Sequence, residues 1–184
     1  MSSRGKQRLA NGFALPSAVL QGKVLQMPAQ SQTQPLLDAY DVRILAELQA
    51  EARMTLAELG RRVHLSQPAV AERVRKLEAA GVITGYRASV NLAALGYGIR
   101  AMVRVGRTDY SAMVQLIAKL PEVVNAWNIT GEDSWALEIA VADVAHLDDV
   151  VSQLCLLGET STSIILKTLR EYQAMLPRVK ENTA

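Results

Sequence analysis

The segment 55–81 contains two short helix patterns separated by a tight turn, and this spacing strongly limits how the chain can fold. The sequence TLAE at 55–58 matches a capping box and predicts a helix from Leu56 to about His64. Ser66 is in position to cap a second helix, which the glycine at the end of the segment is expected to terminate. Two helices joined by so short a turn pack at a steep angle, so the segment predicts a helix-turn-helix.

Apolar residues at helical spacing fill the corner between these two predicted helices. They are Leu59, Val63, Leu65, Val70, Val74 and Leu77. A preceding helix is predicted from Asp38, its N-cap, to about Ala50. His64 occupies the turn between the two helices, and we expect it to adopt a left-handed conformation, which histidine tolerates better than most residues.

The exposed face of the second predicted helix carries groups that suit the DNA major groove. Gln67 can pair with adenine and Arg75 with guanine, and Glu72 can accept from a cytosine amino group or orient an arginine. The alternative from this segment alone is a solvated face, because Glu72 and Lys76 are spaced for an intrahelical ion pair. The residues expected to contact DNA are Ser66, Gln67, Pro68, Ala69, Glu72, Arg73, Arg75, Lys76 and Arg87.

Charge is distributed unevenly along the chain, although the formal net charge is only +2. Residues 1–107 carry 15 Lys or Arg and 7 Asp or Glu, whereas residues 108–184 carry 5 and 11. Residues 61–87 alone hold six basic and two acidic side chains. This asymmetry favours a polyanion as partner for the first part of the chain only.

The second half of the chain changes from helical spacing to alternation. Apolar side chains recur at every second position from Ile99 to Val105, which predicts a strand with Arg100, Met102 and Arg104 on its other face. The elements expected after it are a helix at 110–120, strands at 123–130 and 134–142, a helix at 143–156 and a strand at 161–169. The order βαββαβ is that of a ferredoxin-like domain, an antiparallel sheet with both helices on one face.

These patterns predict an α+β chain in five parts. They are a flexible N-terminal extension at 1–36, a winged helix-turn-helix DNA-binding domain at 37–90, a linker at 91–98, a ferredoxin-like domain at 99–170 and a C-terminal tail at 171–184. The β-type sequence ITGYRASV at 83–90 is split by Gly85, so a two-stranded wing or a single exit strand is expected there. A signal peptide is not expected, because Pro16 interrupts the short apolar stretch near the start.

Three segments of the chain resemble the leucine-responsive regulatory protein/AsnC family, the feast/famine transcription regulators. They are residues 36–97, 120–141 and 159–168. The resemblance implies a winged helix-turn-helix that binds double-stranded DNA, joined by a β-linker to a ferredoxin-like domain. It also implies that the second domain senses a small molecule, usually an amino acid, and forms homodimers that assemble into octamers.

The resemblance places the ligand near the turn at 131–133. Residue types alone support this less well, because TGEDS at 130–134 also reads as an ordinary hairpin turn with solvated acids. The pair Ser134-Trp135 replaces the Asp-aromatic pair common in the family, which leaves the identity of the effector open. The residues expected to contact the effector are Gly131, Glu132, Asp133, Ser134, Thr160 and Thr162.

An enzyme is disfavoured by the residue content. The chain has one cysteine, Cys155, two separate histidines and no phosphate-binding glycine loop, so we expect no catalytic residue, no metal and no cofactor. Cys155 lies between two leucines and is expected to be buried, which fits a cytoplasmic, nucleoid-associated bacterial protein without a membrane partner. The sequence therefore predicts a sequence-specific DNA-binding regulator with an amino-acid effector, and the alternative is a ligand-independent DNA-architectural protein.

Overall fold

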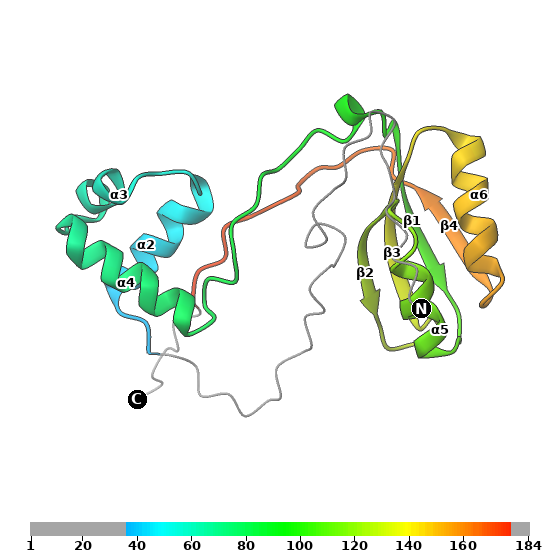
Figure 1. Ribbon diagram of the computed structural model, residues 1–184, viewed down its shortest axis with the longest axis horizontal. Coiled ribbons are helices and arrows are strands. Elements are labelled where there is room, and N and C mark those ends of the chain that lie inside the picture. The colour runs from blue at the N-terminus through cyan, green and yellow to red at the C-terminus, as the bar shows by residue number, and fades with distance from the viewer. Residues whose placement is uncertain (1–35, 178–184) are drawn as a thin grey trace, which may run out of the picture. The chain divides into compact units, whose positions relative to one another are not determined.

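The computed structural model describes residues 36–177, which form two compact units (Figure 1). One unit contains residues 36–89 together with 169–177, and the other contains residues 90–168. All but the last residue of the expected N-terminal extension, and the end of the expected tail, lie outside the described residues. Within the described range no helix is long and apolar enough to cross a membrane.

Three helices form the first unit. They are α2 (Ala39–Ala50), α3 (Leu56–Val63) and α4 (Gln67–Ala79). Asp38 caps α2 as predicted, because its side chain accepts the backbone N–H of Asp41 at 2.9 Å while Asp41 accepts the N–H of Asp38 at 3.2 Å. The left-handed Gly81 (φ +69°) follows α4, as the sequence predicted.

The capping box predicted for α3 is only half formed. Thr55 Oγ1 accepts the backbone N–H of Glu58 at 3.2 Å, but the Glu58 carboxylate binds Arg61 and Arg62 instead of returning to the cap. Leu56 is 37% exposed, because the first position of α3 lies at the margin of the core. The core residues of this unit are Ile44, Leu45, Leu59, Val63, Val70, Val74 and Leu77.

The turn between α3 and α4 requires two special residues. His64 adopts the predicted left-handed conformation, with φ 60° and ψ 44°. Gly60 lies against the turn, where the backbone N–H of Leu65 donates to its carbonyl at 2.9 Å. A Cβ atom on Gly60 would come within 2.6 Å of the Leu65 carbonyl oxygen, so only glycine allows this close approach.

The segment after α4 forms no strand, contrary to the expected wing. Residues 84–91 are exposed and have no regular secondary structure. A strand is stable only when its backbone N–H and C=O groups pair with a neighbour. Within the described residues no second segment provides such a ladder here, so this β-type sequence remains unpaired in the single chain.

The second unit has the predicted βαββαβ order. Its elements are β1 (Ile99–Val105), α5 (Tyr110–Ile117), β2 (Val123–Asn128), β3 (Trp135–Val141), α6 (Val144–Cys155) and β4 (Thr160–Ile164), preceded by a short 3-10 helix at Ala93–Leu95. The strands form one antiparallel sheet in the order β2-β3-β1-β4. Strands β2 and β4 are shorter than expected, but the fold class is confirmed.

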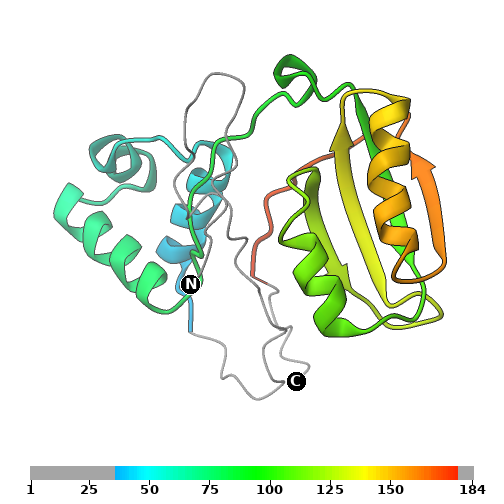
Figure 2. The same ribbon diagram turned by 45° about the vertical axis from the view of Figure 1, so that its right-hand side comes forward.

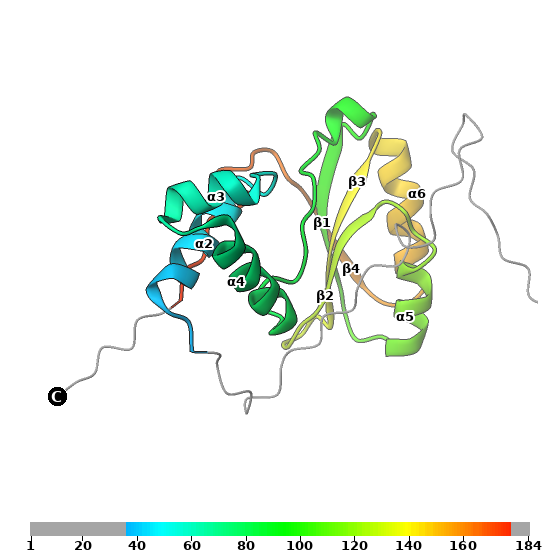
Figure 3. The same ribbon diagram turned by 60° about the vertical axis from the view of Figure 1, so that its left-hand side comes forward.

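Both helices of this unit cover the same face of the sheet, as Figures 2 and 3 show from two directions. The core between helices and sheet contains Ala101, Val103, Val105, Met113, Leu120, Trp135, Leu137, Ile139, Val141, Leu147, Val150 and Leu154. Cys155 is exposed, so the expectation of a buried thiol is wrong. The preceding Leu154 occupies the buried position, and the next residue of a helix points about 100° away from it.

Candidate functional site

The N-terminal end of α4 presents polar groups to solvent. Ser66, Gln67 and Pro68 are exposed there, and Ala69 is half-buried. Ser66 has the extended backbone of an N-cap, but its side chain makes no capping hydrogen bond. The first turn of α4 therefore offers backbone N–H groups and a hydroxyl to an outside acceptor such as a phosphate oxygen.

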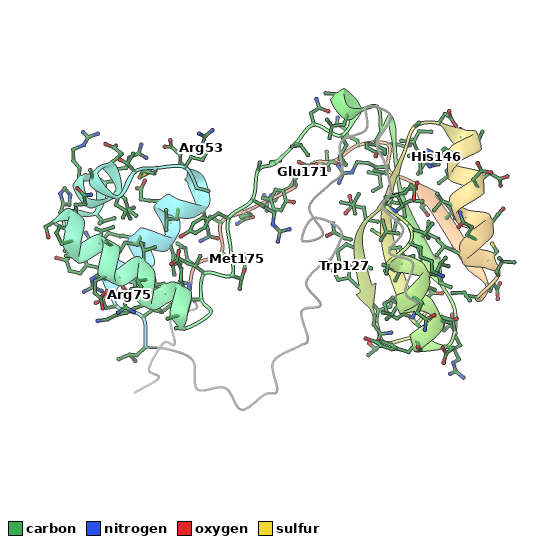
Figure 4. The ribbon with its side chains drawn as sticks, viewed as in Figure 1. Arg53, Arg75, Trp127, His146, Glu171 and Met175 are labelled. Carbon is green, nitrogen blue, oxygen red and sulfur yellow. The ribbon has the colours of Figure 1, made fainter. Side chains whose placement is uncertain are left out.

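A connected set of charges lies along the exposed face of α4, on which Figure 4 labels Arg75. The Arg75 guanidinium donates two hydrogen bonds to Glu72, at 2.9 Å from Nε and 2.7 Å from Nη2, and Lys76 Nζ lies 3.7 Å from the same carboxylate. The hydrogen bond from Arg75 lowers the pKa of Glu72 and raises the pKa of Arg75. Glu72 is therefore ionised at neutral pH and orients Arg75, which is one of its two predicted roles.

Arg73 points to the body of the unit instead of standing beside Arg75. Its Nη1 atom lies 2.7 Å from Asp38 Oδ2 and 2.8 Å from Asp41 Oδ1, and its guanidinium lies 5.3 Å from the centre of the Tyr40 ring. These contacts join α4 to the N-terminus of α2, so a phosphate would have to displace two carboxylates to reach Arg73. Arg87 is exposed in the irregular segment after α4.

The turn between β2 and β3 carries the second candidate site. Gly131 has a φ of +127°, a conformation that side chains rarely adopt. Ser134 joins the turn to the sheet, because its N–H donates to Val105 O at 2.9 Å and its carbonyl accepts from Ile129 N–H at 2.9 Å. Asp133 Oδ2 lies 3.6 Å from Arg104 Nε, so the turn and the end of β1 place a carboxylate beside a guanidinium.

Sheet register separates the predicted effector residues into two groups. Thr160 and Thr162 pair with Val105 and Val103, whose side chains face the helices, and Thr160 Oγ1 lies 2.9 Å from the thiol of Cys155. Directly paired residues share one face of a sheet, so both threonines lie on the helix side. Arg104, the partner of Asp133, lies on the other face and was not among the residues expected to contact the effector.

The face of the sheet opposite the helices holds a buried charge. Glu138 is 8% exposed and accepts from Arg100 Nη2 at 2.5 Å and from Asn125 Nδ2 at 2.8 Å. Burial raises the pKa of Glu138, but the hydrogen bonds from Arg100 and Asn125 outweigh it and hold this pKa below the ordinary glutamate value. Trp127, labelled in Figure 4, follows Asn125 by two residues on β2, so both side chains lie on this face of the sheet. The Trp127 side chain is 44% exposed.

Two protein-family models match the chain. The AsnC-type helix-turn-helix domain matches residues 37–78, which contain α2, α3 and nearly all of α4. The Lrp/AsnC ligand binding domain matches residues 100–175, which contain the sheet and its two helices. The chain belongs to the Lrp/AsnC family. It is a transcription regulator with a DNA-binding helix-turn-helix and a ligand-binding domain, which confirms the resemblance inferred from the sequence.

Relatives and solved structures agree with this membership. The chain is 40% identical over 143 residues to the leucine-responsive regulatory protein of Rhizobium meliloti, covering 74% of this chain and 92% of that protein. A Neisseria meningitidis transcriptional regulator in complex with L-methionine has a TM-score of 0.71 at 28% identity, covering 76% of this chain and 96% of that one. A feast or famine regulatory protein of Mycobacterium tuberculosis, also complexed with L-methionine, has a TM-score of 0.71 at 33% identity, covering 77% and 100%.

Proposed function

We propose that this Lrp/AsnC regulator reads operator DNA with α4, and that an amino acid bound at the turn between β2 and β3 changes its affinity for that DNA. The observation that carries the first part is the exposed face of α4. It combines an uncapped N-terminal turn with Gln67, Glu72, Arg75 and Lys76, while the opposite face of the helix is fixed in the core.

The roles of the α4 side chains follow from their chemistry. Arg75 carries two parallel donors, which match the O6 and N7 acceptors of guanine, and Gln67 at the helix start matches adenine. Glu72 holds the Arg75 guanidinium extended along the helix face before DNA arrives. We propose that the residues around them contact the DNA backbone or base edges; these are Ser66, Pro68, Ala69, Lys76 and Arg87. Arg73 instead positions α4 against α2.

The effector site is proposed at the Asp133–Arg104 pair. A free amino acid carries an ammonium and a carboxylate, which complement the carboxylate of Asp133 and the guanidinium of Arg104. Gly131, Glu132 and Ser134 lie next to Asp133 in the same turn. The two structural neighbours bound to L-methionine support an amino acid as the ligand class. Thr160 and Thr162 face the helices. We propose that they do not touch the ligand and that they affect the site only through the position of β4.

We further propose that the chain works as a homodimer that assembles into octamers at the bacterial nucleoid. The helices cover one face of the sheet, which leaves Trp127, Met102 and Arg104 on the other face of the single chain. A second copy packed on this face would remove the exposed tryptophan from water.

Selection of DNA from a random pool, followed by titration at one fixed salt concentration, tests the proposed reading of operators. The expected result is an affinity for the selected sequence at least about a thousandfold above that for random DNA. A ratio near one would instead identify a DNA-architectural protein. A thermal-shift screen of the twenty amino acids tests the effector, since a ligand that binds only the folded state raises the melting temperature.

A further inference from the structure

The DNA-binding unit contains a groove that lies outside the helix-turn-helix formed by α3 and α4. It lies between α2 and the irregular segment 82–89, has a volume of about 720 Å³ and is lined on those two sides by apolar side chains including Leu45, Leu48, Val82 and Ile83. The remaining wall comes from residues 172–175, which lie about ninety residues further along the sequence. Figure 4 shows Met175 beside this unit.

Gln49 near the end of α2 holds the C-terminal segment through its backbone. Met175 N–H donates to Gln49 Oε1 at 2.8 Å, and Gln49 Nε2 donates to Met175 O at 3.0 Å. The side-chain amide thus pairs with both polar groups of one residue, as a neighbouring strand would. The same Nε2 atom also donates to Leu45 O at 3.0 Å, which orients the amide on the helix.

This contact depends on Gln49 more than on buried apolar area. Leu169, Tyr172 and Met175 are each at least three-quarters exposed, so their side chains contribute little through the hydrophobic effect. A contact that rests on a few exposed hydrogen bonds is weak enough to form and break readily. Gln49 supplies both hydrogen bonds to Met175, so its replacement should weaken the docking.

The other end of the same segment is fixed to the ligand-binding unit. The backbone N–H of Ile165 donates to Arg100 O at 2.8 Å, and Arg100 Nη1 donates to Thr168 Oγ1 at 3.3 Å. Only residues 169–174 separate these bonds from the bonds at Met175. Strand β4, which precedes Ile165, runs beside β1, the strand that carries Arg104.

We propose that residues 172–175 of the same chain dock on the DNA-binding unit, where Gln49 holds them and they form one wall of this groove. The docked segment gives each chain a second connection between ligand-binding sheet and helix-turn-helix, besides the linker at 90–98. Movement of β4 on effector binding then releases or tightens the segment at Gln49 and so alters the DNA-binding unit. This last step rests on the proposed effector site, whereas the docking itself does not.

The test compares Gln49→Glu with Gln153→Glu in the full chain. Glutamate keeps the shape of glutamine but removes the donor that meets Met175 O, and Gln153 makes the same bond on α6, to Asp149 O at 3.2 Å, without contacting the C-terminal segment. In Gln49→Glu we expect amide hydrogen exchange at 170–177 and tryptic cleavage after Arg170 to accelerate about tenfold, as for loss of one net hydrogen bond. Unchanged exchange in Gln49→Glu, or an equal change in Gln153→Glu, would overturn the docking.

A cross-linking experiment identifies the chain that supplies the segment. Ala52→Cys and Met175→Cys, which both line the groove and leave Gln49 in place, are combined with Cys155→Ser, because Cys155 is exposed, and treated with a short bis-maleimide. The proposal expects a cross-link within one chain on a denaturing gel. A covalent dimer would assign the segment to a second copy and overturn the proposal, as would the absence of any cross-link.

The regulatory step has its own readout. Gln49→Glu is expected to bind the effector with wild-type affinity by calorimetry but to lose most of the effector-dependent change in operator affinity, whereas Gln153→Glu keeps it. A full response in Gln49→Glu would overturn the regulatory role. If the wild type itself binds no amino acid, the proposed effector site fails, and the exchange and cross-linking results still decide the docking.

Discussion

Replacing Asp133 by asparagine removes one negative charge from the proposed effector site while keeping the size of the side chain. In the structure this carboxylate lies 3.6 Å from Arg104, and the two side chains are 34% and 55% exposed. Ion pairs in such solvent contact contribute about 0–1 kcal/mol to folding, because water screens them. Asp133→Asn should therefore lower the unfolding free energy by less than about 1 kcal/mol.

The same substitution should affect ligand binding far more. A charge-assisted hydrogen bond from a ligand ammonium to Asp133 contributes roughly 1.5–3 kcal/mol, so its loss should weaken the effector affinity by about 10- to 150-fold. Isothermal titration calorimetry with the amino acid found by screening measures this affinity, and a thermal melt measures the stability. The comparison separates a binding residue from a structural one.

Asp148→Asn is the matched control, because it removes one carboxylate from an exposed position on α6 and leaves the turn intact. It should bind the effector as the wild type does. If Asp133→Asn also binds with wild-type affinity, Asp133 does not hold the ammonium and the proposed site is wrong. If both variants lose affinity equally, the effect is one of net charge and not of this turn.

Three further substitutions test other parts of the structure. Arg75→Ala should weaken operator binding by about 5- to 150-fold and relax the preference at one base of each half-site in a selection experiment, whereas Arg61→Ala, which breaks the equivalent intrahelical pair on α3, should leave the preference intact. Gly60→Ala should destabilise the DNA-binding unit by about 1–3 kcal/mol in denaturant titration, because its Cβ would overlap the Leu65 carbonyl; unchanged stability would contradict the close approach. The pKa of Glu138 is lowered in the folded protein, so the ionised carboxylate stabilises the fold at pH values above the ordinary glutamate pKa. This stabilisation is lost as the pH falls through the folded-state pKa. Between pH 7 and pH 3 the melting temperature should therefore fall more steeply in the wild type than in Glu138→Gln. Parallel slopes would show that Glu138 does not supply the linkage.

The helix boundaries in the DNA-binding unit were predicted well because their signals are local. Asp38, His64 and Gly81 act through their own backbone angles or through neighbours within three residues, so a short stretch of sequence contains the whole cause. Glu58 shows the limit of this reasoning. Its carboxylate has a choice between the cap and two arginines, and sequence spacing alone does not rank them.

The parts that the sequence analysis missed depend on pairing between distant segments. The β-type stretch at 83–90 has strand-forming residues, but a strand also needs a partner, and the single chain offers none in the described range. The alternation of apolar residues in β1 correctly predicted that Arg104 faces away from the core. Only the pairing of β1 with β3 and β4 shows that Arg104 lies beside the turn that carries Asp133. The same register moves Thr160 and Thr162 to the helix side.

Titration of selected operator DNA, with and without a saturating amino acid effector at one fixed salt concentration, tests the central proposal most directly. Coupling between two binding sites on one protein typically changes affinity by about 5- to 150-fold. We expect a change of this size in the wild type and none in Asp133→Asn, whose operator affinity without effector should match the wild type. Equal operator affinities of the wild type with and without a bound amino acid would contradict the account.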